Sequence, residues 1–411
     1  MERSTSVPEK LDCRCCIVGG GPAGMMLGFL LARGGVDVVV LEKHADFLRD
    51  FRGDTIHPST LEVMHELHLL DEFLKRPHQE LPHLDVQFGP TALTIADFTH
   101  LPTRCKFLAF MPQWDFLDFL AEQAERCPTF HLRMEAEVTD LLSDGERIAG
   151  VMAKTPQGML EVRAELTVAA DGRSSVVRER AGLRSMAFGA PMDALWMRLS
   201  KSPDDPGQST GRVGGGRILA MIDRGDYWQC AYVIPKGSAE EWRKGGLQVL
   251  RDEIARLAPF LKGRVDELRD WNDVKLLTVL VDRLPRWHLP GLLCIGDAAH
   301  AMSPIGGVGI NLAIQDAVAA ANVLTVPLRA GSVSESLLHR VQKRRELPTR
   351  LTQGMQRFLQ THAVERVLAR PGGQPMKPPR VFRLMQHFPC LRRIPARLIG
   401  VGFRPEHVKE L

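Results

Sequence analysis

The chain has 411 residues, of which 44% are hydrophobic and 25% are charged, and its formal net charge is +4. This composition is ordinary for a globular protein and excludes a disordered chain, and the small net charge gives no indication of nucleic-acid binding. Since 411 residues exceed what one hydrophobic core usually supports, we expect two domains or one domain with a large insertion.

A glycine fingerprint lies between a predicted strand and a predicted helix near the N-terminus. Gly19 permits a sharp turn, Gly21 allows the backbone to approach a pyrophosphate, and Gly24 lets the helix pack close to the strand. Glu42 ends a second predicted strand, 36–41, and is the acidic residue that a ribose hydroxyl requires. The pattern predicts a dinucleotide site that contains Gly19, Gly21, Pro22, Ala23, Gly24, Glu42 and Lys43.

The uncharged stretch 15–32, flanked by Arg14 and Arg33, could be mistaken for a signal peptide or a membrane span. Its glycines and Pro22 stand in fingerprint register, and no small-residue cleavage site precedes a polar region. We therefore interpret it as the first strand, turn and helix of a soluble enzyme.

The eight cysteines are scattered along the chain without an export signal, which predicts reduced thiols in a cytoplasmic protein. Cys13, Cys15 and Cys16 stand close enough in the sequence to suggest a metal site. In a strand, however, Cys13 and Cys15 share one face while Cys16 points to the other. No matching cysteine or histidine pair completes a tetrahedral site, so we predict packing roles and no metal.

Helical and strand-like patterns alternate between the fingerprint and residue 172. Asp144-Gly145 indicates a hairpin turn. A buried strand over 165–170 then ends in a second small-residue turn, Asp171-Gly172. The other predicted elements are helices over 60–67 and 114–125 and strands near 86–88, 107–110, 136–142 and 147–153.

From residue 183 to about 284 the sequence changes to short strand-like pieces separated by turns. This pattern predicts a mainly antiparallel sheet inserted into the nucleotide-binding domain. A strand over 291–295 then returns the chain to that domain at Gly296-Asp297, and a helix beginning near Asn311 closes it. We predict an α/β protein with a Rossmann-like domain (1–80, 101–182 and 285–330), an inserted substrate domain (81–100 and 183–284) and a basic helical segment (331–411).

Three motifs therefore follow one another along the chain: Gly19-x-Gly21-x-x-Gly24, Asp171-Gly172 and Gly296-Asp297. In this order and at these separations, over about residues 12 to 325, they resemble the flavoprotein aromatic hydroxylases of the p-hydroxybenzoate hydroxylase type, which include the ubiquinone-biosynthesis hydroxylases. The resemblance implies a single-component monooxygenase with bound FAD that uses NADPH or NADH and O2. It further implies that an aromatic substrate is hydroxylated through a flavin C4a-hydroperoxide.

The resemblance also implies roles for individual residues. Asp297 corresponds to the aspartate that accepts hydrogen bonds from the flavin ribityl hydroxyls, and otherwise caps a turn. Arg52 corresponds to an arginine that lies against FAD and assists nicotinamide binding, and is otherwise a surface residue. Gln113 corresponds to a glutamine that binds the FAD chain, or else caps the following helix. Asp171 and Gly172 match a motif associated with both FAD and NAD(P)H.

The glycine-rich run from Pro304 to Asn311 is expected to stabilise anionic reduced flavin, because its backbone N–H groups converge on the flavin pyrimidine edge at a helix N-terminus. Pro304 resembles the residue beside the position of oxygen addition, and Val308 predicts apolar surroundings there. His300 is either a proton donor at this place or a packed structural histidine. The predicted catalytic residues are Pro304, His300 and Arg52, and the predicted flavin contacts here are Gly296, Asp297, Gly307, Val308, Gly309, Ile310 and Asn311.

The inserted sheet is expected to carry the substrate site. In the strand 228–234, alternation puts Trp228, Cys230 and Tyr232 on one face, and the sequence leaves open which face lines the pocket. No dedicated carboxylate clamp is evident, which favours an apolar phenol, quinol precursor or polycyclic substrate over a small acid. The candidate substrate residues are Trp196, Arg217, Met221, Trp228, Cys230 and Tyr232.

Positive charge is concentrated in residues 331–411, which hold 16 Lys or Arg and 5 Asp or Glu. The segment is either a solvated helical tail folded against the body or, through residues 392–399, a weak contact with anionic lipid or an acidic partner. The chain is expected to be a monomer or homodimer. Two other functions stay open: an FAD-dependent reductase or dehydrogenase of an apolar substrate, and a non-catalytic flavin-binding redox sensor.

Overall fold

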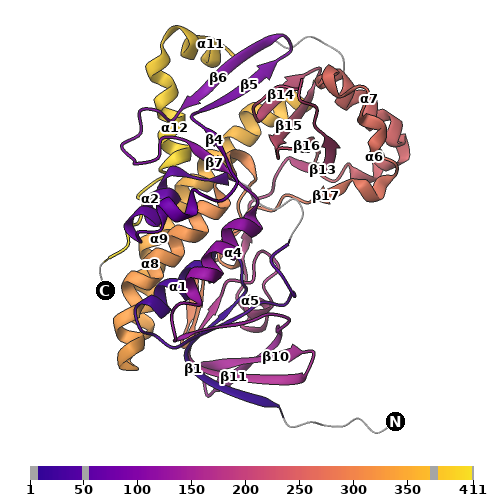
Figure 1. The fold of residues 1–411 in the computed structure, drawn as a ribbon. Coiled ribbons are helices and arrows are strands. Elements are labelled where there is room, and N and C mark those ends of the chain that lie inside the picture. Colours follow the sequence, from indigo (N-terminus) through magenta and orange to yellow (C-terminus); the bar gives the residue numbers. More distant parts are fainter. Residues whose placement is uncertain (1–7, 49–54, 371–377, 410–411) are drawn as a thin grey trace, which may run out of the picture.

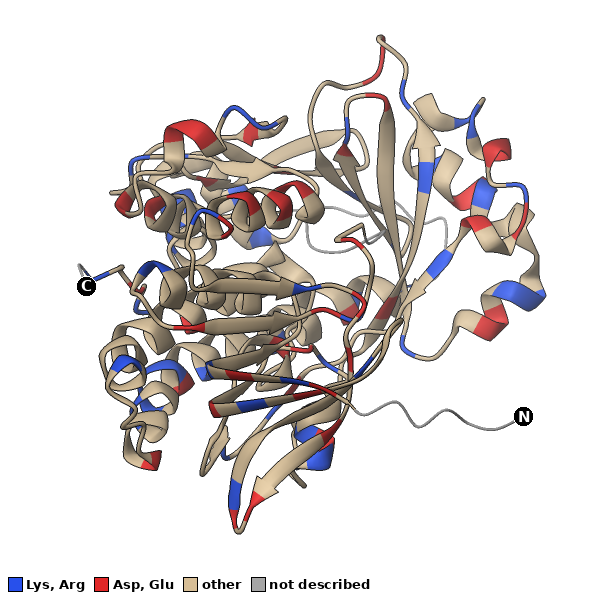
Figure 2. Cartoon of the chain, turned by 60° about the horizontal axis from the view of Figure 1, so that its bottom comes forward, with Lys and Arg blue, Asp and Glu red and all other residues tan. Residues whose placement is uncertain are grey.

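A computed structural model of the chain describes residues 8–48, 55–370 and 378–409. Figure 1 shows an eight-stranded sheet at the bottom and a seven-stranded sheet at the top, with long helices beside them. Figure 2 shows that elements around both sheets carry charges of both signs.

The eight-stranded sheet has a parallel core in the order β20-β11-β1-β2-β8. In β1, Cys15 and Ile17 face one hydrophobic cluster while Cys16 and Val18 face another, as expected for a parallel strand that is covered on both sides. Helices α1, α4 and α8 contribute to the first cluster. The bounds are β1 (Glu9–Val18), β2 (Val38–Leu41), β8 (Phe130–Arg133), β9 (Glu137–Asp144), β10 (Arg147–Thr155), β11 (Gly158–Ala169), β19 (His288–Leu289), β20 (Leu292–Cys294), α1 (Pro22–Arg33), α4 (Gln113–Ala124) and α8 (Gly309–Ala330).

The seven-stranded sheet has the order β17-β13-β16-β15-β14-β5-β6, and every pair except β14–β5 is antiparallel. The predicted mainly antiparallel sheet is therefore confirmed, and it includes strands from two separate parts of the chain. Helices α6 and α7 cover one of its faces. The bounds are β5 (His83–Phe88), β6 (Thr91–Asp97), β13 (Met192–Ser200), β14 (Thr210–Gly214), β15 (Arg217–Asp223), β16 (Tyr227–Pro235), β17 (Lys275–Leu277), α6 (Ala239–Gly245) and α7 (Leu247–Leu257).

Smaller elements connect the two sheets. Strands β3 and β4 pair with β7, and β12 pairs with β18 where the chain leaves and re-enters the first sheet region. The bounds are β3 (Thr55–Ile56), β4 (Gln79–Leu81), β7 (Leu108–Phe110), β12 (Met186–Ala187), β18 (Asp282–Arg283), α2 (Pro58–Glu66), α3 (Leu70–Phe73) and α5 (Val176–Arg180).

The C-terminal segment is helical and largely folded against the body. One side of α9 is buried although it carries many polar residues, including Arg345 and Thr349. Helix α8 lies within Ile305–Ala330, the one helical stretch in the described ranges that is long and apolar enough to cross a membrane. In this stretch 78% of the most apolar window is buried inside the protein, as in a core helix. The bounds are α9 (Glu335–Leu359), a π-helical turn (Gln360–Val364), α10 (Glu365–Leu368), α11 (Arg380–His387) and α12 (Arg393–Gly400).

Candidate active site

The fingerprint glycines form a turn that lies directly against the end of β11. Gly19 has φ +106°, and a Cβ atom there would lie 2.5 Å from the carbonyl oxygen of Ala170. A Cβ atom on Gly24 would lie 2.0 Å from the carbonyl oxygen of Gly19, so α1 approaches the turn as closely as two backbones allow. A Cβ atom on Gly21 would meet nothing within 4 Å. The space in front of Gly21, at the N-terminus of α1, is therefore a cradle that a ligand's pyrophosphate can fill.

Glu42 is held at the same turn. It follows β2, is 9% exposed, and its two carboxylate oxygens accept hydrogen bonds from the backbone N–H of Gly20 (2.9 Å) and of His44 (3.1 Å). A carboxylate held at this turn, about 20 residues after the fingerprint, is the residue type that accepts a ribose O–H in dinucleotide sites. The neighbouring Lys43 is exposed.

The second motif lies beside the first. Asp171 follows β11, and its Oδ2 accepts a hydrogen bond from the backbone N–H of Val177 (3.2 Å) at the start of α5. Its Oδ1 is buried and has no hydrogen-bond partner within the described part of the chain. Burial raises the pKa of the Asp171 carboxyl. An acceptor oxygen left without a protein donor beside the fingerprint fits a site where a bound ligand supplies the donor.

The third motif lies between two helices. Gly296 has φ +57°, and a Cβ atom there would lie 3.1 Å from Cβ of Ala23 in α1 and 3.4 Å from Cβ of Ala313 in α8. The carboxylate of the next residue, Asp297, is 32% exposed and lies 3.6 Å from Nη2 of Arg173. Asp297 is thus fixed at the mouth of the fingerprint turn and is free to accept hydrogen bonds from ligand hydroxyls.

The glycine-rich run from Pro304 to Asn311 presents backbone rather than side chains. Pro304 is exposed, and Gly306 and Gly307 adopt φ values of +78° and +63°. The side chains of Val308 and Asn311 are only 2% and 3% exposed. Val308 packs with two apolar neighbours, Met302 and Leu312, so the surroundings of its side chain are apolar.

Comparison with known proteins agrees with this geometry. The family model described as "FAD binding domain" matches residues 12–355. The chain belongs to this family. It is 34% identical over 338 residues to 6-methylpretetramide 4-monooxygenase of Streptomyces rimosus, a match that covers 81% of this chain and 80% of the relative.

Two further comparisons support the assignment. The chain is 27% identical over 342 residues to 3-demethoxyubiquinol 3-hydroxylase of Escherichia coli, covering 80% of this chain and 84% of that protein. Its fold matches P. aeruginosa PqsL in complex with 2-aminobenzoylacetate with a TM-score of 0.74 at 23% identity, covering 87% of this chain and 98% of that chain. The predicted family, the α/β fold class and the FAD cofactor are confirmed, and the chain is a flavin-dependent monooxygenase.

For His300 the sequence left two roles open, a proton donor or a packed structural histidine. In this FAD-binding protein its placement fits the second. It is 1% exposed, its Nε2 lies 2.5 Å from Oδ2 of Asp316, and its ring centroid lies 4.9 Å from that of Trp287. Burial, the Asp316 contact and the Trp287 ring hold this side chain in place, although its Nδ1 is buried without a hydrogen-bond partner in the described part of the chain. The prediction that His300 is catalytic is therefore not supported by its placement.

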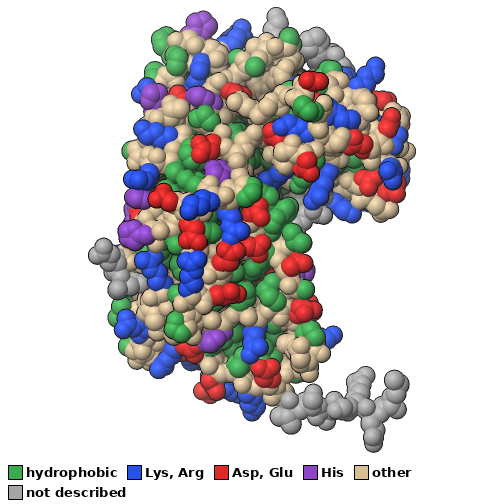
Figure 3. Space-filling model, in the orientation of Figure 1, with side chains coloured by type: hydrophobic (Ala, Val, Ile, Leu, Met, Phe, Trp, Pro, Cys, Tyr) green, Lys and Arg blue, Asp and Glu red, His purple; other side chains and the backbone are tan. Residues whose placement is uncertain are grey.

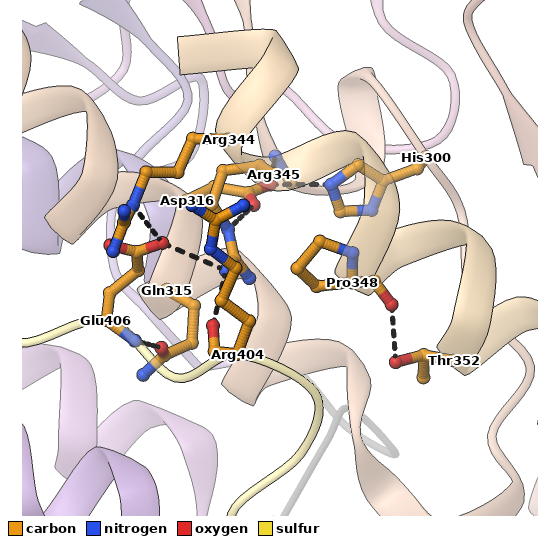
Figure 4. Close-up of polar contacts among 10 residues, drawn as sticks. His300, Gln315, Asp316, Arg344, Arg345, Pro348, Thr352, Arg404 and Glu406 are labelled. Carbon is orange, nitrogen blue, oxygen red and sulfur yellow. Dashed lines mark hydrogen bonds and ion pairs between the residues drawn. The ribbon is translucent and has the colours of Figure 1, made fainter. Parts of the chain in front are cut away.

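A buried charge network surrounds Asp316 (Figure 4). Asp316 Oδ2 also accepts the backbone N–H of Gly296 (3.1 Å), and its Oδ1 lies 3.0 Å from Nε of Arg345 on α9. Arg345 in turn lies 3.3 Å from Glu406 near the C-terminus, and these three side chains are at most 1% exposed. Although burial alone would raise the pKa of the Asp316 carboxyl, the charges and hydrogen bonds of His300 and Arg345 outweigh it and lower the pKa. The network fixes the turn that carries Asp297.

Three glutamines on one side of α9 and the π-helical turn hold the segment before Pro304. Gln356 donates from Nε2 to the carbonyl oxygens of Ser303 (2.8 Å) and Ile305 (2.9 Å), and its Oε1 accepts the N–H of Ser303 (3.1 Å). Gln353 donates to the carbonyl oxygen of Ala301 (3.1 Å), and Gln360 donates to Oγ of Ser303 (2.9 Å). Side chains from α9 therefore set the path of the backbone into the flavin loop, the name used below for Pro304–Asn311.

His57, at the start of α2, connects the flavin loop to α12. Its Nε2 lies 3.0 Å from the carbonyl oxygen of Gly307 and its Nδ1 lies 2.7 Å from that of Ile399. Beside it, the hydroxyl of Ser59 donates to Oδ1 of Asn311 (2.7 Å), so the Asn311 side chain binds α2. Full burial lowers the pKa of His57. Neither His57 nor Ser59 was singled out in the sequence.

Two other predicted cofactor residues have different outcomes. Arg52 lies outside the described residues. Gln113 is the first residue of α4, and the capping position is taken by Pro112, so Gln113 does not cap this helix. Its side chain is half-buried and can reach a ligand.

Most candidate substrate residues lie on the face of the seven-stranded sheet that α6 and α7 cover. Trp228, Cys230 and Tyr232 are fully buried beneath α6 and α7, together with Met221. Arg217 also faces α7, where its Nε lies 3.6 Å from Glu253. The helices cover this face because it is the apolar one, so the prediction that these residues line a pocket is not supported. Trp196 alternates to the opposite, less buried face.

Proposed function

We propose that the chain uses NAD(P)H and O2 to hydroxylate an aromatic substrate, either an apolar phenol or a polycyclic ring system, in the cytoplasm. The observation that carries this proposal is the convergence of the three motifs at the open cradle at Gly21, with Gly296 packed between α1 and the first turns of α8, which the flavin loop precedes. The 34% identity to a protein named 6-methylpretetramide 4-monooxygenase supports a polycyclic substrate. Bound FAD supplies the chemistry, because it accepts a hydride from the nicotinamide and activates O2.

The residues of this chain bind and orient that cofactor. In our proposal the cradle at Gly21 and the N-terminus of α1 receive the pyrophosphate, and Glu42 accepts a ribose hydroxyl. Asp297 accepts the ribityl hydroxyls. The N–H groups of the flavin loop and the N-terminus of α8 stabilise negative charge on the reduced ring. Arg52, Gln113 and the Asp171-Gly172 motif keep the nicotinamide and FAD-chain roles that the family resemblance implies.

The substrate face of the second sheet is built mainly from small and apolar residues. Register places Trp196 opposite Ala231, Ala231 opposite Ala220, and Ala220 opposite Gly211 across four neighbouring strands. Helix α10 packs on the same face through Val367, beside Ile218, and we infer that a flat ring system lies against the rest of the row, with an indole at one end. We therefore favour a polycyclic aromatic substrate over a single small ring.

The proposal is tested by anaerobic reduction of the FAD-loaded enzyme with NADPH and with NADH, across a panel of phenols and polycyclic aromatics. We expect a matching compound to accelerate flavin reduction and to gain one oxygen atom when O2 is admitted, as measured by mass spectrometry. Reduction without any oxygenated product would favour the reductase alternative. Negligible reduction with every compound would favour the redox sensor.

Substitution of Ala220 by Phe is expected to lower kcat/KM for the substrate found in that screen at least about tenfold, because the ring fills the row of small residues. FAD affinity and thermal stability should not change. Met221→Leu is the matched control, since the next residue faces α7 and the swap conserves volume, so kinetics should be unaltered and the stability loss below about 1.5 kcal/mol. Unimpaired turnover in Ala220→Phe would place the substrate elsewhere.

A further inference from the structure

Helix α11 carries two exposed stripes, one apolar and one basic. Val381, Leu384 and Phe388 stand at i, i+3 and i+7, and they are 53%, 49% and 55% exposed. Residues at this spacing share one side of a helix. Arg380 and Arg383, both exposed, form the adjacent stripe together with His387. The helix therefore presents an apolar strip with positive charge along its edge.

The opposite side of α11 anchors it to the protein. The ring of Phe382 packs against Phe88 of β5, with centroids 5.8 Å apart, and Gln386 donates to the carbonyl oxygen of Thr94 in β6 (3.1 Å). Because these contacts fix the rotation of the helix, the apolar strip is directed away from the core. Its exposure is a property of the folded protein.

Helix α12 continues this surface. Ile394 is 58% exposed and stands between the exposed Arg393 and Arg397, while Ala396 is fully buried beneath it. Figure 3 shows hydrophobic, basic and histidine side chains intermingled at the upper left of the molecule, where Figure 1 places α11 and α12. We call the exposed sides of α11 and α12 the docking face.

The charge around the docking face has one sign. Residues 366–405 contain nine Lys or Arg and no Asp or Glu. Among the described residues, no carboxylate lies within ion-pair distance of Arg380, Arg383, Arg393 or Arg397. These guanidinium groups are therefore available to an external anion, next to four exposed apolar side chains.

We propose that the docking face binds the surface of an anionic lipid bilayer. A helix with an apolar strip flanked by cations inserts that strip at the boundary of headgroups and acyl chains while its cations meet lipid phosphates. A second copy of the chain fits less well, because a two-fold contact would place this positive surface against itself. The proposal does not depend on the substrate or the reaction.

The test is co-sedimentation of the FAD-loaded full chain with vesicles of phosphatidylcholine plus phosphatidylglycerol, and with vesicles of phosphatidylcholine alone. We expect binding to the anionic vesicles that weakens as salt is raised. Arg380→Gln together with Arg383→Gln should weaken it about 30-fold, since each cation near an anionic surface contributes about fivefold. Leu384→Gln together with Phe388→Gln should weaken it at least about tenfold.

The control is Val326→Gln, which removes an apolar side chain that is 64% exposed on α8, away from the docking face. It should bind vesicles like the unchanged protein. All these positions are exposed, so bound FAD and thermal stability should be the same in every variant. Equal binding by all variants, or no binding to anionic vesicles at low salt, would overturn the proposal. A dimer in solution that dissociates when Leu384→Gln and Phe388→Gln are introduced would also overturn it, because the occupant would then be a second copy of the chain. Binding of polyglutamate without binding of anionic vesicles would overturn it as well, because the occupant would then be an acidic polymer.

Discussion

Replacing Asp316 by Asn is expected to lower the free energy of unfolding by about 3–5 kcal/mol, the usual cost of removing one partner from a buried ion pair. Asp316 is fully buried, and its oxygens accept from Arg345, His300 and the backbone of Gly296. An asparagine amide has one acceptor oxygen, and its NH2 group would face groups that already donate. The guanidinium of Arg345 would then remain in the core without its carboxylate.

The effect has a defined pH dependence. Because the folded protein lowers the pKa of Asp316, its contribution to stability is complete above the ordinary pKa of about 3.9 and is lost as the pH falls through the lower folded value. Urea unfolding of the FAD-free protein should show the full difference between the unchanged protein and Asp316→Asn near neutral pH. The difference should shrink in acid.

The matched control is Asp140→Asn. Asp140 lies 4.0 Å from Arg180 and both side chains are more than half exposed, at 63% and 55%. Surface ion pairs contribute about 0–1 kcal/mol, so this change should be nearly neutral at every pH. Equal losses in the two variants would show that the buried network does not hold the turn at Gly296.

Gly24→Ala and Gly21→Ala are expected to fail in different ways although they lie three residues apart. A Cβ atom on Gly24 would stand 2.0 Å from the carbonyl oxygen of Gly19, which backbone atoms cannot tolerate. Helix α1 must shift, at or above the roughly 1–3 kcal/mol typical of an overpacked core. Gly21→Ala meets no protein atom within 4 Å, so the FAD-free protein should be as stable as before.

The two variants are separated by measuring FAD affinity and unfolding independently. Gly21→Ala should bind FAD at least about tenfold more weakly, because its methyl group occupies the place of the pyrophosphate. Its urea midpoint without FAD should be unchanged. Gly24→Ala should lower both the FAD affinity and the urea midpoint. Normal FAD binding by a stable Gly21→Ala protein would mean that the dinucleotide does not use the cradle.

The sequence was sufficient for those parts of the site that depend on backbone chemistry. Glycine spacing predicted the turn at Gly19, and the positions of Asp171 and Gly296 predicted which strand ends meet it. These features are local, because a tight turn or a close helix approach demands a particular residue at a particular place. The family and the cofactor followed from them and are confirmed.

The faces of the inserted sheet could not be predicted in the same way. Alternation showed that Trp228 and Tyr232 share a face, but the side that α7 covers depends on packing between distant segments. The aromatic side chains drew attention as substrate contacts, whereas burial under helices is where large apolar groups contribute most. The smaller residues Ala220 and Ala231 lie on the opposite face, which we propose for the substrate.

The polar residues that support the flavin loop were also missed. Gln353, Gln356 and Gln360 share one helix side, and an uncharged polar stripe within a basic helix was the available signal. Asp316 and Arg345 gave no comparable pattern, because a buried ion pair is recognised only when both partners are placed in space. Arg345 is 29 residues from Asp316 and 61 residues from Glu406 in the sequence.

The contacts of His57 and Glu406 have a consequence for how the enzyme is made. The fingerprint leaves the ribosome early, yet the flavin loop is bound to Ile399 through His57, and Arg345 is bound to Glu406. Proteins are synthesised from the N-terminus, and segments fold as their partners appear. Part of the cofactor's support is therefore translated long after the fingerprint, so FAD meets a finished site only after residue 406 has been added.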